Sequence, residues 1–110
     1  MTQPSVPTVD IDSLPTDALV LDVREDDEWA AGHIDGAVHI PMNEVPDRVA
    51  DLPSGQPVSV VCRSGGRSAR VTGFLVQAGV DAHNVAGGMQ IWEAAGRPMV
   101  SENGAAPSVI

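Results

Sequence analysis

The chain of 110 residues predicts an α/β domain with a mainly parallel sheet covered by helices on both faces. Three observations indicate this fold. Short valine-rich runs alternate with segments of helical periodicity, the runs are nearly continuously apolar, and glycines end several of the helical patterns. The length suits one domain and leaves no room for a second.

Five apolar segments are expected to form the strands. The clearest are residues 18–23, 37–40 and 57–62, and two weaker ones lie near 8–11 and 82–85. Outside a domain of residues 8–100, residues 1–7 and 101–110 are small or polar and contain prolines, so we expect both to be flexible tails.

Two short helices are expected in the first half of the chain. Residues 26–33 begin with acidic side chains, which favour a helix N-terminus, and the helix should stop at Gly32. Residues 43–52 have Asn43 as a cap and tolerate Pro46 in the first turn.

Two further helices are expected after the single cysteine. The first has an apolar face at i, i+3, i+4 and i+7, and Gly79 ends it. The residues of that face are Val71, Phe74, Leu75 and Ala78. The second helix follows Gly87-Gly88 and stops at Gly96.

The charge of the chain limits its partners. Six arginines and no lysine stand against fifteen acidic residues, which gives a formal charge of −9. This charge disfavours attraction to nucleic acid or to an anionic membrane, so we expect neither partner. Arg63, Arg67 and Arg70 nevertheless fall close together and form a local positive segment that can attract a small anion.

The single cysteine, Cys62, indicates which cell compartment and which cofactors to expect. It can form no intramolecular disulfide and supplies no thiolate cluster for zinc. The N-terminus has neither the basic nor the apolar region of a secretory signal, and no apolar stretch is long enough to span a membrane. We therefore expect a cytoplasmic protein with no metal and no cofactor.

The segment Cys62-Arg63-Ser64-Gly65-Gly66-Arg67-Ser68 joins an expected strand to an expected helix. Backbone N–H groups converge at such a turn, and the positive helix N-terminus lowers the pKa of a thiol there. Gly65 and Gly66 can adopt the positive φ angles that turn these N–H groups inward. The remaining side chains are expected to bind an oxyanion: Arg67 with Arg63 or Arg70 by charge, and Ser64 and Ser68 by their hydroxyls.

A buried structural thiol is the alternative interpretation of Cys62. A lone cysteine that ends an apolar run is most often a small core residue. A purely structural turn, however, needs no more than one glycine and no pair of arginines within five residues of the thiol. The neighbours of Cys62 therefore favour a nucleophile.

Three segments of the chain resemble the rhodanese family, in the family's order. They are "LDVREDDEWAAGHIDGAVHIP" (21–41), "VVCRSGGRSA" (60–69) and "NVAGGMQIWEAAGRPM" (84–99). The resemblance covers about residues 8–100 and implies a rhodanese-like fold with a five-stranded parallel sheet.

The resemblance also implies a sulfurtransferase that acts by double displacement. Cys62 would take a sulfur atom from thiosulfate or a persulfide donor and hold it as a persulfide. The acceptor would be cyanide or an external thiol, such as thioredoxin or a biosynthetic enzyme. The resemblance implies supporting positions for Asp22 and Arg24, as a charge pair, and for Trp92 beside the pocket. Packing of Trp92 with Met89 is the alternative.

Two other functions remain for this fold. A related phosphatase or arsenate reductase has a loop one residue longer, which would require arginine at position 68, where this chain has Ser68. Cys62 to Arg67 spans six residues, the size found in the family's sulfurtransferases. Noncatalytic family members, which bind a partner or an anion, usually lack the cysteine.

Overall fold

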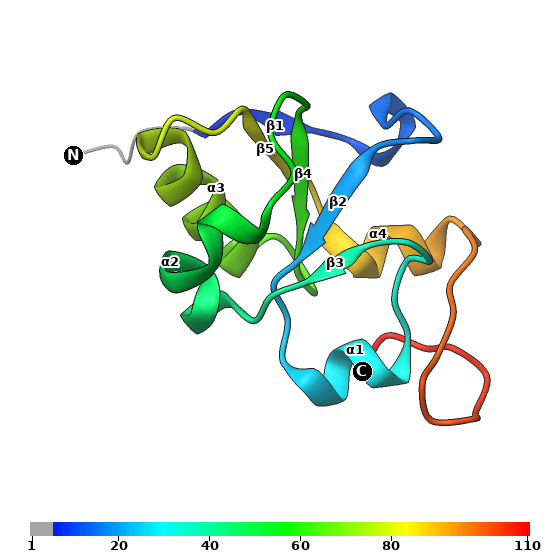
Figure 1. The fold of residues 1–110 in the computed structure, drawn as a ribbon. Coiled ribbons are helices and arrows are strands. Elements are labelled where there is room, and N and C mark those ends of the chain that lie inside the picture. The colour runs from blue at the N-terminus through cyan, green and yellow to red at the C-terminus, as the bar shows by residue number, and fades with distance from the viewer. Residues whose placement is uncertain (1–5) are drawn as a thin grey trace.

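A computed structural model describes residues 6–110 and contains a five-stranded sheet in the order β1-β5-β4-β2-β3 (Figure 1). Each of the four strand pairs is parallel. The strands are β1 (Thr8–Val9), β2 (Leu19–Asp22), β3 (Val38–His39), β4 (Val58–Val61) and β5 (Ala82–Val85). The predicted fold class and all five predicted strands are confirmed, and β4, which precedes Cys62, is the central strand.

The helices cover both faces of this sheet (Figure 1). They are α1 (Asp26–Ala31), α2 (Val45–Arg48), α3 (Gly66–Gln77) and α4 (Gly88–Ala94). α2 and α3 pack on one face, and α4 packs on the other. Within residues 6–110, no helix combines the length and the apolarity needed to cross a membrane.

The segment 43–52 does not form the single helix that its sequence predicts. A 3-10 helix, Met42–Glu44, comes first, α2 lasts four residues, and a second 3-10 helix, Val49–Asp51, follows. Asn43 lies inside the first 3-10 helix and caps nothing. Pro46 is tolerated in the first turn of α2, as expected, but it has no N–H to donate and so cannot join that turn to the residues before it.

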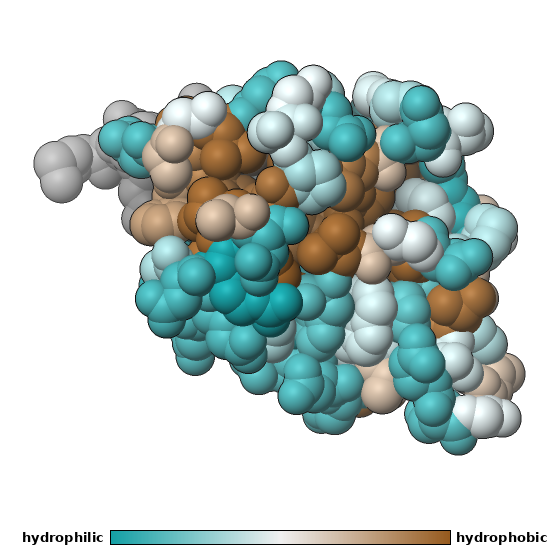
Figure 2. All heavy atoms as spheres, viewed as in Figure 1, coloured by the Kyte–Doolittle hydropathy of each residue, from teal (hydrophilic) through white to brown (hydrophobic). Residues whose placement is uncertain are grey.

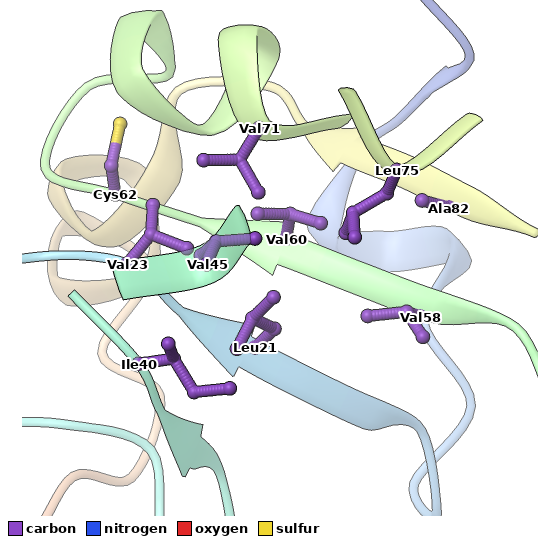
Figure 3. Packing of buried hydrophobic residues seen from close by; sticks show 10 residues of the cluster. All are labelled: Leu21, Val23, Ile40, Val45, Val58, Val60, Cys62, Val71, Leu75 and Ala82. Carbon is purple, nitrogen blue, oxygen red and sulfur yellow. The ribbon is translucent and has the colours of Figure 1, made fainter. Parts of the chain in front are cut away.

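The larger core cluster lies between α2, α3 and the sheet (Figure 3). Val71 and Leu75 of α3 are buried there, but Phe74 is 41% exposed and Ala78 is also exposed. The predicted apolar face was therefore too wide. The buried side chains of α3 are instead those of Ser68, Val71, Thr72 and Leu75. Cys62 lies at the end of this cluster, and its sulfur points away from Val23 (Figure 3).

The second core cluster lies on the face of α4, and residues 101–110 pack near it. The sequence predicted flexible tails at residues 1–7 and 101–110. Most of the first lies outside the described residues; in the second, Val109 contacts this cluster, and the segment lies beside α1 (Figure 1). The backbone N–H of Glu102 donates to Ala30 O at 2.8 Å, and that of Ser108 donates to Ala31 O at 2.9 Å. The segment thus satisfies carbonyls in the last turn of α1 that have no partner within their helix.

Candidate active site

Cys62 lies at the carboxyl end of the central strand, between β4 and the first turn of α3. Its exposed fraction is only 1%. The backbone N–H of Gly65 donates to the sulfur at 3.0 Å, and the Ser68 hydroxyl oxygen lies 3.3 Å from it. The sulfur is therefore surrounded by hydrogen-bond donors that suit a thiolate.

The pKa of the Cys62 thiol is lowered by these donors. Burial by itself raises the pKa, because a thiolate loses its hydration. The hydroxyl of Ser68 and the backbone N–H groups of Ser68, Gly65 and Ser64 outweigh burial and hold the pKa below its ordinary value. The loop thus increases the fraction of thiolate, the nucleophilic form, at any given pH.

The start of α4 fixes the backbone of this loop. The N–H groups of Met89 and Gln90 donate to Cys62 O at 2.8 Å and to Arg63 O at 2.9 Å. A Cβ at Gly88 would lie 2.3 Å from Cys62 O, so only glycine permits this approach. Gly65 has φ +114°, which favours glycine and turns its N–H toward the sulfur.

Ser68 connects the sulfur to a residue that the sequence analysis missed. Its hydroxyl also lies 2.6 Å from Asn84 Oδ1, and Asn84 Nδ2 donates to Gly65 O at 3.4 Å. Asn84 belongs to β5 and is 7% exposed. The signal for it in the sequence is one amide in a short strand, directly after His83, which does not reveal its neighbours.

Arg67 forms an ion pair that the sequence analysis also missed. Its Nη1 and Nη2 donate to Glu28 Oε1 at 2.7 Å and to Glu28 Oε2 at 2.9 Å. The hydrogen bond from Arg67 holds the pKa of Glu28 below its ordinary value, and Glu28 raises that of Arg67. In the sequence, Glu28 is one of four acidic residues at a helix start, where exposure to solvent accounts for their charge. Nothing in the sequence therefore indicates a contact between Glu28 and the loop.

The two other arginines near the loop lie in different environments. Arg63 is exposed, and its Nε donates to Ile110 O at 3.1 Å. With the Gln90 amide oxygen turned toward it, Arg63 Nη1 donates to Gln90 at 2.9 Å. Arg70 is exposed on α3, one turn beyond the start of the helix. Ser64 is exposed in the loop. Gly66 is also exposed, but it is the first residue of α3 and does not have the positive φ expected from the sequence.

Asp22 and Arg24 form the buried charge pair that the resemblance implied. Arg24 Nη2 lies 2.8 Å from Asp22 Oδ2, and both side chains are almost fully buried. The same Nη2 donates to Gly32 O at 2.7 Å, which ties the end of α1 to the end of β2. Arg24 Nη1 has no hydrogen-bond partner among residues 6–110.

Trp92 is partly buried and packs against the core cluster on the face of α4. It contacts the cluster that contains Met89 and Val61, and its Nε1 donates to Pro98 O at 2.9 Å. The guanidinium of Arg97 lies 5.3 Å from its ring centroid. These contacts favour the packing role of Trp92 over a role as a wall of the pocket.

Aromatic stacking fixes the position of α1 beside the loop. The Trp29 ring stacks on His33, with centroids 3.5 Å apart, and on His39, with centroids 4.6 Å apart. His39 Nε2 is 2.8 Å from Arg24 O. In the part of the chain that is described, no three His, Cys, Asp or Glu side chains gather where they could hold a metal ion.

Comparison with known proteins agrees with this geometry. The rhodanese-like domain family matches residues 10–95. YtwF of Bacillus subtilis is 42% identical over 79 residues, which are 72% of this chain and 77% of that protein. The thiosulfate sulfurtransferase GlpE of Pseudomonas putida is 37% identical over 78 residues, 70% of this chain and 71% of its own length.

A solved structure agrees with both sequence comparisons. The crystal structure of a rhodanese-related protein from Thermoplasma volcanium superposes with a TM-score of 0.81 at 33% identity. The match covers 86% of this chain and 97% of that one. The chain therefore belongs to the rhodanese-like domain family.

Proposed function

We propose that this domain is a sulfurtransferase that carries sulfur as a persulfide on Cys62. The observation that supports this function best is the set of donors around the Cys62 sulfur: the Gly65 N–H at 3.0 Å and the Ser68 hydroxyl at 3.3 Å. The donors stabilise the attacking thiolate, and the same loop can stabilise the negative outer sulfur of a persulfide. Relatives named as sulfurtransferases add to this support.

The reaction has two displacement steps. The Cys62 thiolate attacks the outer sulfur of thiosulfate or of a persulfide, a new sulfur–sulfur bond forms, and sulfite or a thiolate leaves with the electron pair of the broken bond. An acceptor then attacks the outer sulfur of the Cys62 persulfide and restores the thiolate. With cyanide as the acceptor the product is thiocyanate. Neither step needs a metal or an added oxidant.

The acceptor must come from outside the 110-residue sequence, since Cys62 is its only cysteine. An external thiol, thioredoxin or a biosynthetic enzyme has the required chemistry. Such a cycle needs a reduced thiol, so a reducing compartment such as the cytoplasm suits it. The candidate contacts for an anionic donor are four residues of the loop segment 62–68 and one residue a turn further along α3: Arg63, Ser64, Gly66, Arg67 and Arg70.

Phosphatase or arsenate reductase activity is the less favoured function. At position 68, where the longer loop of those enzymes requires an arginine, the Ser68 hydroxyl lies 3.3 Å from Cys62 Sγ. A hydroxyl at this distance supports a thiolate but supplies no charge to a phosphate.

One experiment tests the proposed function directly. Treatment with thiosulfate or a small alkyl persulfide should raise the intact mass by one sulfur atom, cyanide should remove that sulfur, and Cys62→Ser should gain none. Hydrolysis of a phosphate ester is the control reaction. Absence of any mass gain with either donor, together with turnover of the ester, would reject the sulfurtransferase function.

A further inference from the structure

The ion pair between Glu28 and Arg67 changes the electrostatics of the proposed donor site. Both terminal nitrogens of Arg67 are engaged by one carboxylate, at 2.7 and 2.9 Å. The Glu28 side chain is 13% exposed and that of Arg67 is 29% exposed, so solvent screens the pair only in part. An anion that approaches Arg67 therefore meets a guanidinium whose charge is already balanced.

Glu28 is held in this position from its own helix. Its Oε1 also accepts the backbone N–H of Glu25 at 3.1 Å, which completes a capping box at the start of α1. Arg24 fixes the other end of α1 through Gly32 O at 2.7 Å. The carboxylate is thus positioned by the fold and is not a mobile surface group that swings away when a ligand arrives.

The surroundings add negative charge on the same side. Glu25, Asp26 and Asp27 are exposed at the start of α1, and the surface around this helix is hydrophilic (Figure 2). The negative charge of Glu25 also raises the pKa of Arg67. A dianion such as thiosulfate is disfavoured here, whereas a persulfide that releases a simple thiol carries less negative charge into this field.

We propose that Glu28 is a specificity-determining residue that, by pairing with Arg67, disfavours thiosulfate and favours a persulfide donor with an uncharged leaving thiol. This inference rests on the proposed function, because it concerns the first displacement at Cys62. Loading by a persulfide forms the Cys62–sulfur bond, breaks the donor's sulfur–sulfur bond and releases a thiolate that takes up a proton. No sulfonate needs a cationic partner in that reaction.

Glu28→Gln is the variant that tests the proposal. Glutamine at this position keeps the capping box of α1 but removes the charge. We expect kcat/KM for thiosulfate to rise about tenfold, mainly through a lower KM, a change of about 1.4 kcal/mol. For a small alkyl persulfide without a carboxylate, kcat/KM should change less than about twofold. The measurement is the rate of sulfur loading of Cys62 followed by intact mass.

Asp27→Asn is the matched control. It removes one negative charge from the same helix, but Asp27 is exposed and is not the partner of Arg67. We expect it to change thiosulfate loading by less than about threefold. Glu28→Gln in an Arg67→Ala background should likewise have no larger effect than Asp27→Asn, since Glu28 acts through Arg67. Glu28→Asp, which shortens the carboxylate and keeps its charge, provides a second variant with an intermediate gain.

The outcomes separate this inference from the proposed function. If the alkyl persulfide loads Cys62 but Glu28→Gln and Glu28→Asp leave thiosulfate use unchanged, the donor anion binds elsewhere, and the specificity role of Glu28 is wrong. An equal gain in Asp27→Asn would assign the effect to the general field of α1 and would also overturn it. If neither donor loads the wild-type protein, the proposed function fails, and the inference fails with it.

Discussion

The Ser68 hydroxyl lies between two acceptors, Cys62 Sγ at 3.3 Å and Asn84 Oδ1 at 2.6 Å. A hydroxyl has one proton, so it can donate fully to only one acceptor at a time. The shorter distance favours Asn84 while the thiol is neutral. A thiolate or persulfide anion is a stronger acceptor, and the proton can then turn toward sulfur. Ser68 is therefore a donor whose contribution grows as charge develops on Cys62.

Ser68→Ala tests this donor. Loss of the hydroxyl should raise the pKa of Cys62, because burial then opposes fewer hydrogen bonds to the thiolate. The reaction with a neutral alkylating agent, measured against pH, should have its midpoint at higher pH and be about tenfold slower at neutral pH.

Ser64→Ala is the comparison for this experiment, because Ser64 acts on the thiol through its backbone N–H and not through its hydroxyl. Its midpoint should stay near the wild-type value. A shift in Ser64→Ala as large as that in Ser68→Ala would contradict a specific role of the Ser68 hydroxyl.

The residues of the site differ in how far the sequence predicts them. The location of Cys62 at a strand end, the glycine in a left-handed conformation and the donor role of Ser68 all follow from the contiguous loop. Glu28, Asn84 and Gln90 come from α1, β5 and α4, and no local spacing connects them to the loop. Tertiary contacts alone give these three residues their roles.

At the scale of elements, the approach of α4 to the loop depends on Gly88. The first N–H groups of α4 have no partner within the helix and instead donate to carbonyls of Cys62 and Arg63. This requires the helix to start in direct contact with the loop backbone, where a Cβ at Gly88 would lie 2.3 Å from Cys62 O. The glycine pair between β5 and α4 therefore shapes the turn and also allows the contact with the loop.

Gly88→Ala should destabilise the domain and disturb the loop together. The backbone at this position has φ +54°, which strains any L residue, and the new methyl group would also collide with Cys62 O. We expect a loss of about 2 to 4 kcal/mol in the free energy of unfolding and slower alkylation of Cys62. Denaturant unfolding and the alkylation rate measure the two effects.

Gly96→Ala is the matched control for backbone strain. Gly96 has φ +70°, but a Cβ there would have no atom within 4 Å. This variant should lose only about 1 to 2 kcal/mol and react normally at Cys62. Equal losses of stability and reactivity in both variants would show that the contact with the loop is unimportant.

The sequence predicts helices and strands well where burial determines their structure, and poorly where the segment is partly exposed. The valine-rich strands follow from their continuous apolar runs, because a parallel strand is buried on both faces. Residues 43–52 are partly exposed and carry Pro46, so weak local preferences decide between 3-10 and α-helical turns. Phe74 was misassigned because apolar spacing defines a helical stripe only approximately when the buried face also contains polar Thr72.

At the scale of the whole molecule, residues 101–110 make packing contacts that their composition does not predict. Their small and polar residues are typical of a mobile tail, yet the segment packs through single backbone contacts, such as Ser108 N–H to Ala31 O at 2.9 Å. Gly32 permits this approach, since a Cβ there would lie 2.6 Å from Ser108 O. Contacts of this kind leave no periodic pattern in a sequence, so the fold alone reveals them.

The negative net charge of the molecule, like the charge of Glu28, disfavours a dianionic sulfur donor such as thiosulfate. The formal charge is −9, and Arg67, which lies in the loop, is balanced by Glu28. A dianionic donor therefore approaches through a repulsive field that salt screens, because the Debye length falls from about 30 Å at 0.01 M to about 8 Å at 0.15 M. Donors without net charge experience little of this field.

Ionic strength should consequently change the use of thiosulfate in a direction that reports the field at Cys62. Between about 10 mM and about 150 mM salt, we expect kcat/KM for thiosulfate to rise about two- to fivefold. Reaction of Cys62 with a neutral alkylating agent provides the control, and its rate should stay constant. In Glu28→Gln the rise should be smaller, because Arg67 then attracts the dianion and salt screens that attraction as well. A fall in thiosulfate use with salt in the wild-type protein would mean that the arginines near the loop outweigh the acidic surface.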